Sequence, residues 1–176
     1  MLKTVLIVIV VAIAAVLIYA ATRPDNFRIE RSAVISAAPD RVFALVGDLR
    51  QFNTWNPWLR KEPSAELTYE GAASGVGSAY RWRGDKTGSG RMEIVESMAP
   101  RRVLMKLDFL NPWESHNQAE FSVEPQSGGG SKVTWAMFGP SPFMSKLMSI
   151  AFSMEKMVGP DFEAGLANLK AMAEKP

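Results

Sequence analysis

The longest apolar run in the chain lies at its N-terminus. Residues Val5 to Ala21, VLIVIVVAIAAVLIYAA, contain no charged side chain. In a helix with a rise of about 1.5 Å per residue they span roughly 25 Å, which is close to the thickness of the hydrocarbon core of a bilayer. The pattern predicts a membrane-crossing helix within residues 1–23.

Two interpretations of this run are open, a cleavable signal peptide and an uncleaved anchor. Signal peptidase needs small residues at the last position before the cut and two positions earlier. A cut after Ala20 or Ala21 would put Ile18 or Tyr19 at the second of these positions, so we expect a single-pass anchor. Counting basic residues on its two sides favours a cytoplasmic domain, whereas the very short N-terminal tail favours an extracytoplasmic one, which we expect here.

After a short polar joint, residues 27–35 alternate between apolar and polar side chains, which predicts a β-strand. A helix is expected next, because Pro39 suits a first helical turn and an apolar stripe follows it before Gly47. Pro57 limits a second helix to a short piece over residues 49–55.

Six further segments show strand character and are separated by turn signals at hairpin spacing. They are Glu66 to Tyr69, Ser78 to Arg83, Gly90 to Ser97, Arg102 to Phe109, Asn117 to Glu124 and Lys132 to Phe138. With the first strand they predict one antiparallel sheet of about seven strands with a polar face and an apolar face. The apolar face would carry Tyr80, Trp82, Met92, Ile94, Val103, Met105, Leu107, Phe109, Ala119, Phe121, Val123, Trp135 and Met137.

The last part of the chain has apolar residues at helical spacing that could cover this face. They are Met144, Leu147, Met148, Ala151, Phe152, Val158, Phe162, Leu166 and Leu169. We expect one long helix over residues 142–175, kinked at Gly159-Pro160. Its methionines suit either an ordinary core with flexible filler or the lining of a ligand cavity, and the sequence leaves both open.

One charged residue interrupts the apolar stripe of this helix. Glu155 falls between Met148, Phe152 and Phe162, and Arg31 occupies the inward phase of the first strand. A carboxylate in an apolar setting needs a partner or water. We therefore predict an ion pair between Arg31 and Glu155, with solvent exposure of Glu155 near the kink as the alternative.

Two tryptophans, Trp55 and Trp58, stand at the end of the second short helix in FNTWNPWLR. A tryptophan combines a large apolar ring with one N–H donor, so such a pair suits either the rim of a pocket or a plug that closes a core.

Composition excludes several classes of function. The chain has 20 Lys and Arg against 18 Asp and Glu, without a basic stripe, so we expect no nucleic-acid partner. It has no cysteine and a single histidine, His116, so thiolate sites and paired-histidine metal sites are not expected. No P-loop, dinucleotide fingerprint or G-x-S-x-G motif is present, and we expect no cofactor. A general acid or base would have to be Glu155, Tyr80, Arg31 or His116.

The order of these elements resembles the helix-grip fold of the polyketide cyclase and START-like superfamily (SRPBCC), an α+β fold in which a curved antiparallel sheet wraps around a long C-terminal helix. RSAVISAAPDRVFALVGDLRQFNTWNPW is similar to the opening strand, proline-initiated helix and tryptophan-rich ending of that family. GVGSAYRW is similar to its next strands, and FEAGLANLKAMAE to its closing helix. The resemblance covers residues 27–174, and the N-terminal anchor is not part of the fold.

The resemblance implies an apolar cavity between sheet and helix that holds a hydrophobic small molecule or lipid, and it implies no shared catalytic set. Trp58 is then expected to touch ligand and Trp55 to belong to the core. The expected function is a membrane-anchored carrier or sensor of a lipophile. The alternatives are a cyclase-like or dehydratase-like enzyme and an interaction module with a closed core. The ligand-binding candidates are Trp58, Tyr80, Trp82, Phe109, Phe121, Trp135, Met137, Met148, Phe152, Glu155 and Phe162.

Overall fold

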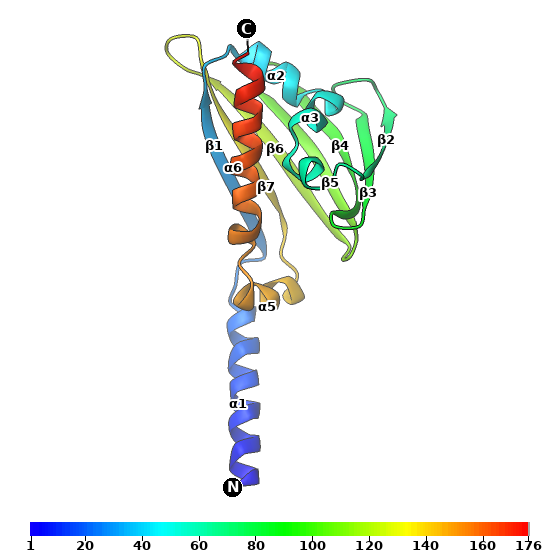
Figure 1. The fold of residues 1–176 in the computed structure, drawn as a ribbon. Helices are drawn as coiled ribbons and strands as arrows, with labels where there is room; N and C mark the ends of the chain where they lie inside the picture. Colours follow the sequence, from blue (N-terminus) through cyan, green and yellow to red (C-terminus); the bar gives the residue numbers. More distant parts are fainter. Residues whose placement is uncertain (176) are drawn as a thin grey trace.

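A computed structural model describes residues 1–175 and contains one sheet with helices on a single face (Figure 1). The seven antiparallel strands lie in the order β1-β7-β6-β5-β4-β3-β2. The elements are α1 (Leu2–Ala21), β1 (Asn26–Ile35), α2 (Pro39–Val46), α3 (Leu49–Trp55), α4 (Pro57–Lys61), β2 (Glu66–Gly71), β3 (Ser78–Gly84), β4 (Gly88–Met98), β5 (Arg102–Asn111), β6 (Ser115–Pro125), β7 (Ser131–Pro140), α5 (Phe143–Ala151) and α6 (Met154–Ala173).

The predicted α+β helix-grip fold is confirmed, with all seven strands within a few residues of their expected positions. The alternation along the strands sets the two faces of the sheet as expected. Met105, Phe121 and Trp135 are buried under the helices, whereas ion pairs such as Arg102–Glu120, 2.7 Å apart, occupy the opposite face. The alternation of apolar and polar residues is sufficient to predict the two faces of the sheet because one face of each strand is exposed to water.

Helix α1 projects away from the domain as a separate rod (Figure 1). It is long and apolar enough to cross a membrane, and its length and composition suit a signal sequence equally. Only Ala20 near its C-terminal end is buried.

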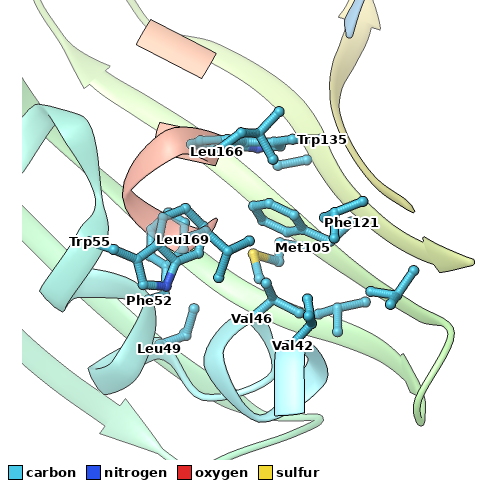
Figure 2. Close-up of a cluster of buried hydrophobic side chains, with 14 of the residues drawn as sticks. Val42, Val46, Leu49, Phe52, Trp55, Met105, Phe121, Trp135, Leu166 and Leu169 are labelled. Atoms are coloured by element: carbon cyan, nitrogen blue, oxygen red, sulfur yellow. The ribbon is translucent and has the colours of Figure 1, made fainter. Parts of the chain in front are cut away.

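The core lies between the sheet and helices α2, α3 and α6 (Figure 2). Asp48 begins α3 by accepting a hydrogen bond from the backbone N–H of Arg50 at 2.7 Å, a usual N-cap arrangement. Because α3 begins at this position, the side chains of Phe52 and Trp55 face the core, and both are fully buried. The indole N–H of Trp55 donates to the carbonyl of Leu45 at 3.1 Å, so Trp55 is a core residue, as predicted.

The C-terminal segment differs from the single kinked helix that the sequence predicted. The chain leaves helical geometry at Phe152, and α6 starts anew with Ser153 as its N-cap, while Gly159 and Pro160 lie inside α6. Pro160 is exposed, so water can reach the carbonyl whose helical hydrogen bond the proline removes. Met148 and Phe152 are exposed and do not cover the sheet. Helical periodicity alone could not show this break, because it does not report whether two consecutive helices share a face.

Candidate functional site

A cavity of about 290 Å³ lies between the sheet, α4 and the first half of α6. It occupies the end of the sheet at which β3 turns into β4 and β7 leads into α5. Its lining is mostly aromatic and aliphatic, consisting of Phe52, Asn56, Trp58, Leu59, Tyr80, Trp82, Lys86, Thr87, Met92, Leu107, Phe109, Ala119, Trp135, Met137, Val158 and Phe162. Such a wall, with a few polar groups, is typical of sites for small hydrophobic ligands.

Stacked aromatic rings form the wall between the cavity and the core. Trp135 on β7 stacks on Phe162 of α6, with centroids 4.3 Å apart and planes inclined by 3°. On its other side Trp135 stacks on Phe121 at 4.9 Å. Trp58 meets both Trp135 and Phe162 edge to face. These contacts fix the indole and phenyl rings, so the wall is rigid on the α6 side.

Two polar groups face the cavity from its interior. The side chain of Asn56 is held by its neighbours, because its Oδ1 accepts from the backbone N–H of Trp58 at 3.0 Å and its Nδ2 donates to Asn53 at 3.1 Å. Burial raises the pKa of Tyr80 well above its usual range, an effect that Tyr69 reinforces and a hydrogen bond with Asn56 opposes. Tyr80 is therefore a neutral phenol that can donate a hydrogen bond to a ligand.

The mouth of the cavity is formed by residues that are only partly buried or exposed, including Leu59 on α4, Lys86 in the β3–β4 turn and Val158 on α6. Glu62 fixes this turn. Its carboxylate accepts hydrogen bonds from the backbone N–H groups of Asp85 at 2.7 Å and Thr87 at 2.8 Å, and from the Thr87 hydroxyl at 2.7 Å. These hydrogen bonds, that of the Thr87 hydroxyl first, lower the pKa of Glu62 to about 2.

Seven of the predicted ligand-binding residues lie in the cavity wall: Trp58, Tyr80, Trp82, Phe109, Trp135, Met137 and Phe162. Phe121 faces the same side of the sheet but lies behind Trp135 in the core and does not reach the cavity. Phe121 was predicted to line the cavity because alternation along a strand shows which face of the sheet a side chain occupies. It does not show whether that side chain reaches the cavity or lies in the core beside it.

Three other predicted ligand-binding residues lie outside this cavity. Met148 and Phe152 are on the surface of the protein, with 48% and 64% of their surface exposed, because the helix breaks before α6 begins. Glu155 is also outside the cavity. It forms the predicted ion pair with Arg31, at 2.6 Å, on the exposed edge where α6 meets β1. Arg31 binds Glu163 as well, at 2.7 Å.

Several residues of the cavity wall were not predicted as ligand-binding residues, although the sequence around two of them carried a usable signal. Ala119 has the smallest side chain among the positions predicted for the apolar face of the sheet. It therefore leaves a space that a larger side chain at this position would fill. Asn56 directly precedes Pro57 and is a natural helix cap, which fixes its side chain at the start of α4. Lys86 and Thr87 lie in a hairpin turn, and nothing in their local pattern indicates that this turn folds over the cavity.

Of the four candidate acids and bases, Tyr80 lines the cavity, while Arg31 and Glu155 pair at the edge of α6. His116 is largely exposed on the other face of the sheet, where its Nδ1 lies 2.7 Å from Asp108. Among residues 1–175, no three His, Asp or Glu side chains gather closely enough to hold a metal ion.

Comparison with known proteins identifies the family to which this fold belongs. The family model for polyketide cyclase / dehydrase and lipid transport matches residues 26–174. The comparison with curated proteins found no match.

Solved structures with a similar fold include a truncated norcoclaurine synthase from Thalictrum flavum, 11% identical, with a TM-score of 0.63 over 86% of this chain and 95% of that one. A protein from Chromobacterium violaceum is 17% identical, with a TM-score of 0.60 over 88% and 100%. One from Nitrosospira multiformis is also 17% identical, with a TM-score of 0.60 over 85% and 97%. Likeness at these identities shows the fold alone. Because the family model matches residues 26–174, most of the chain, the chain belongs to the polyketide cyclase/dehydrase and lipid transport family.

Proposed function

We propose that this chain is a membrane-anchored binding protein that holds a hydrophobic small molecule or a lipid chain between the sheet and α6. Residues 1–23 serve as the anchor and residues 27–174 as the binding domain. The observation that carries the proposal is the aromatic-lined cavity of about 290 Å³. A closed interaction module would have no use for a space much larger than a few water molecules, so the cavity favours ligand binding over that alternative.

The chemistry of the wall suggests what the ligand is like. Most of the wall is apolar, and Asn56 and Tyr80 add hydrogen-bonding capacity inside it. A ligand with an apolar body and one carbonyl or hydroxyl group would satisfy both parts of the site. The volume lies near the lower end of the range for ligand pockets, roughly 300–1,000 Å³, which favours a compact lipophile or a single acyl chain over a whole membrane lipid.

A cyclase-like or dehydratase-like activity is the second candidate, and Tyr80 supports it. A neutral phenol in an apolar cavity can polarise a carbonyl group of the ligand as a hydrogen-bond donor. Tyr80→Phe separates the two candidates, because it removes the donor and leaves the ring. Retained ligand with lost turnover would favour the enzyme, whereas retained ligand without turnover in either form would favour the carrier.

The binding proposal is tested by the lipophile that the full chain retains. The wild type and Ala119→Leu are purified in the same detergent and extracted with organic solvent, and the extracted molecules are quantified by mass spectrometry per mole of protein. Ala119 is buried in the wall, so a leucine there fills part of the cavity without removing an aromatic ring. Val34→Ala, at an exposed position on β1, is the matched control.

We expect one class of lipophile to be retained by the wild type and by Val34→Ala, and to fall by roughly tenfold in Ala119→Leu, which corresponds to about 1.4 kcal/mol of binding free energy. Lipids that merely surround α1 would be equal in all three proteins. If Ala119→Leu does not fold, Trp58→Ala replaces it. Equal lipophile content in the wild type and in a folded cavity variant would contradict the proposal.

A further inference from the structure

Helix α5 and the start of α6 expose an unusual amount of apolar surface. We call this the α5 surface, and it consists of Phe143, Met144, Met148, Ile150, Phe152, Met154 and Met157. Each of these side chains has between 40% and 66% of its surface exposed. So many exposed large apolar side chains within one short segment indicate a binding surface, since monomeric soluble domains rarely expose large apolar patches.

The polarity of α5 is the reverse of that of a helix on a water-soluble domain. Its lysine, Lys146, has 9% of its side chain exposed and forms an ion pair with Asp25 in the joint that follows α1. Met144 and Met148 lie on the other side and point outward. The charge of Lys146 is therefore turned toward the protein, and the two methionines on the opposite side of the helix face the surroundings, an arrangement that suits an apolar medium.

The position of α1 indicates which medium this is. The C-terminal end of α1 packs against α5 (Figure 1), and the joint is held by the Lys146–Asp25 pair and by a 2.6 Å hydrogen bond from the backbone N–H of Ser141 to the carbonyl of Asp25. α1 is long and apolar enough to span the hydrocarbon core, so in the membrane-anchored arrangement proposed above whatever packs at its end lies at the level of the lipid headgroups. This places α5 in the interface layer.

A separate element points to the same level. The β5–β6 turn lies at the end of the sheet nearest to α5 (Figure 1) and carries Trp113, which is 63% exposed, beside the 45% exposed Leu110. Tryptophan prefers the boundary between headgroups and acyl chains, because its ring is apolar and its N–H is polar.

We propose that the α5 surface is embedded in the interface of the same membrane that α1 crosses, and that it turns the cavity mouth toward the bilayer. The proposal rests on the membrane anchoring in the proposed function. Met157 directly precedes Val158, which belongs to the rim of the cavity, and Met154 lies about one helical turn before it. The apolar surface thus continues from the membrane to the mouth, and a lipophile can pass between bilayer and cavity without crossing water. Methionine suits such a path because its flexible side chain adapts to varied partners.

The test uses the absence of cysteine from the natural sequence, which allows single-cysteine labelling of the full chain. Met148→Cys and Met157→Cys report on the α5 surface. Val76→Cys is the matched control, since Val76 is 58% exposed in the loop between β2 and β3, away from α5. Ile9→Cys, in the middle of α1, reports on the anchor. Each variant is labelled with an environment-sensitive fluorophore and reconstituted in vesicles of phosphatidylcholine and phosphatidylglycerol, with lipids that carry a doxyl quencher either near the headgroup or near the end of the acyl chain.

We expect the labels at positions 148 and 157 to emit at shorter wavelength than the label at 76 and to be quenched most by the shallow doxyl group. The label at position 9 is expected to be quenched most by the deep group. If position 9 is quenched while 148 and 157 behave like 76, the inference is overturned and the anchor stands. If position 9 is not quenched, the anchoring itself fails, and lipophile retention still decides the binding function. Energy transfer between copies that rises with protein density, without lipid quenching at 148, would assign the surface to a second copy of the chain and overturn the inference.

Discussion

Trp135 of β7 and Phe162 of α6 lie face to face, 4.3 Å apart and nearly parallel, so a single stack joins the sheet to the C-terminal helix. One side of this stack faces the core through Phe121, and both rings also line the cavity. The same contacts therefore stabilise the fold and shape the site. Changes in this stack should alter folding stability and ligand retention together, whereas changes on the α5 surface should not affect stability.

Phe162→Ala should lower the free energy of unfolding by about 3–5 kcal/mol, because it removes a fully buried ring and leaves a void beside Trp135. Phe152→Ala removes the same ring from a position that is 64% exposed, and it should change the stability by less than about 0.5 kcal/mol. Denaturant titration in detergent, followed by tryptophan fluorescence, measures both. Similar losses in the two variants would contradict the location of these residues.

Gly165→Ala should destabilise the protein although alanine favours helices. A Cβ at this position would lie 2.5 Å from the Trp135 ring and 3.1 Å from Pro57, and Trp135 cannot yield because it is held between Phe121 and Phe162. The overpacking costs about 1–3 kcal/mol, and the helix propensity of alanine offsets about 1 kcal/mol of it, which leaves a net loss of up to about 2 kcal/mol.

The control for Gly165→Ala is the same change in a Trp135→Phe background, where the smaller ring makes room. The cost of the alanine should shrink or vanish there, giving a measurable coupling between the two positions. Equal costs in both backgrounds would show that the clash with Trp135 is not the cause.

The part of the site contributed by the strands could be predicted from the sequence, and the part contributed by the C-terminal segment could not. Tyr80, Trp82 and Phe109 follow from alternation, since a strand with one wet face has only one choice for its large apolar side chains. The misplacement of Phe152 arose where helical periodicity was extended across Ser153. Ser153 accepts a hydrogen bond from the backbone N–H of Lys156 and begins a new helix. A serine at that position is compatible with either a cap or a helix interior, so its role depends on tertiary structure.

The ion pair between Arg31 and Glu155 shows a second limit of prediction from the sequence. The pairing followed from two charges in inward phases, but its position at the edge of the domain depends on Gly159. A Cβ there would lie 2.3 Å from the Arg31 guanidinium, so glycine allows this group to lie flat against α6. The sequence indicated the partners and not the depth at which they meet.

Arg31→Gln should loosen the first half of α6 without unfolding the domain. Arg31 binds Glu155 and Glu163 and thereby holds this half of the helix to β1, but exposed ion pairs contribute little to global stability. Amide hydrogen exchange should accelerate at residues 158–163 and stay unchanged at 166–173. Arg81→Gln, which removes a pair with Glu70 on the other edge of the sheet, should not affect α6. Uniform acceleration along α6, or none, would contradict this role.

Glu62→Gln should remove a pH-dependent contribution to stability at the cavity mouth. The pKa of Glu62 in the folded protein is about 2, against 4.5 for an unperturbed side chain, so folding favours the ionised form. A depressed pKa gives stabilisation that is fully present above about pH 4.5 and is lost as the pH falls towards 2. The difference in unfolding midpoint between the wild type and Glu62→Gln should therefore be constant from pH 5 to pH 7 and decrease steadily below about pH 4.5.

This comparison isolates Glu62, because other carboxylates with lowered pKa values, such as Glu70 and Asp108, titrate equally in both proteins. In the wild type the two carboxylate oxygens of Glu62 accept hydrogen bonds from the N–H groups of Asp85 and Thr87. In Glu62→Gln one of these oxygens becomes an amide N–H₂ donor, so one of the two N–H groups faces a donor and loses its acceptor. The β3–β4 turn should then move away from α4, and lipophile retention should fall at pH 7 because Lys86 and Thr87 belong to the cavity wall. A variant that loses stability at all pH values by the same amount, and keeps its lipophile, would show that the carboxylate does not hold the mouth of the cavity.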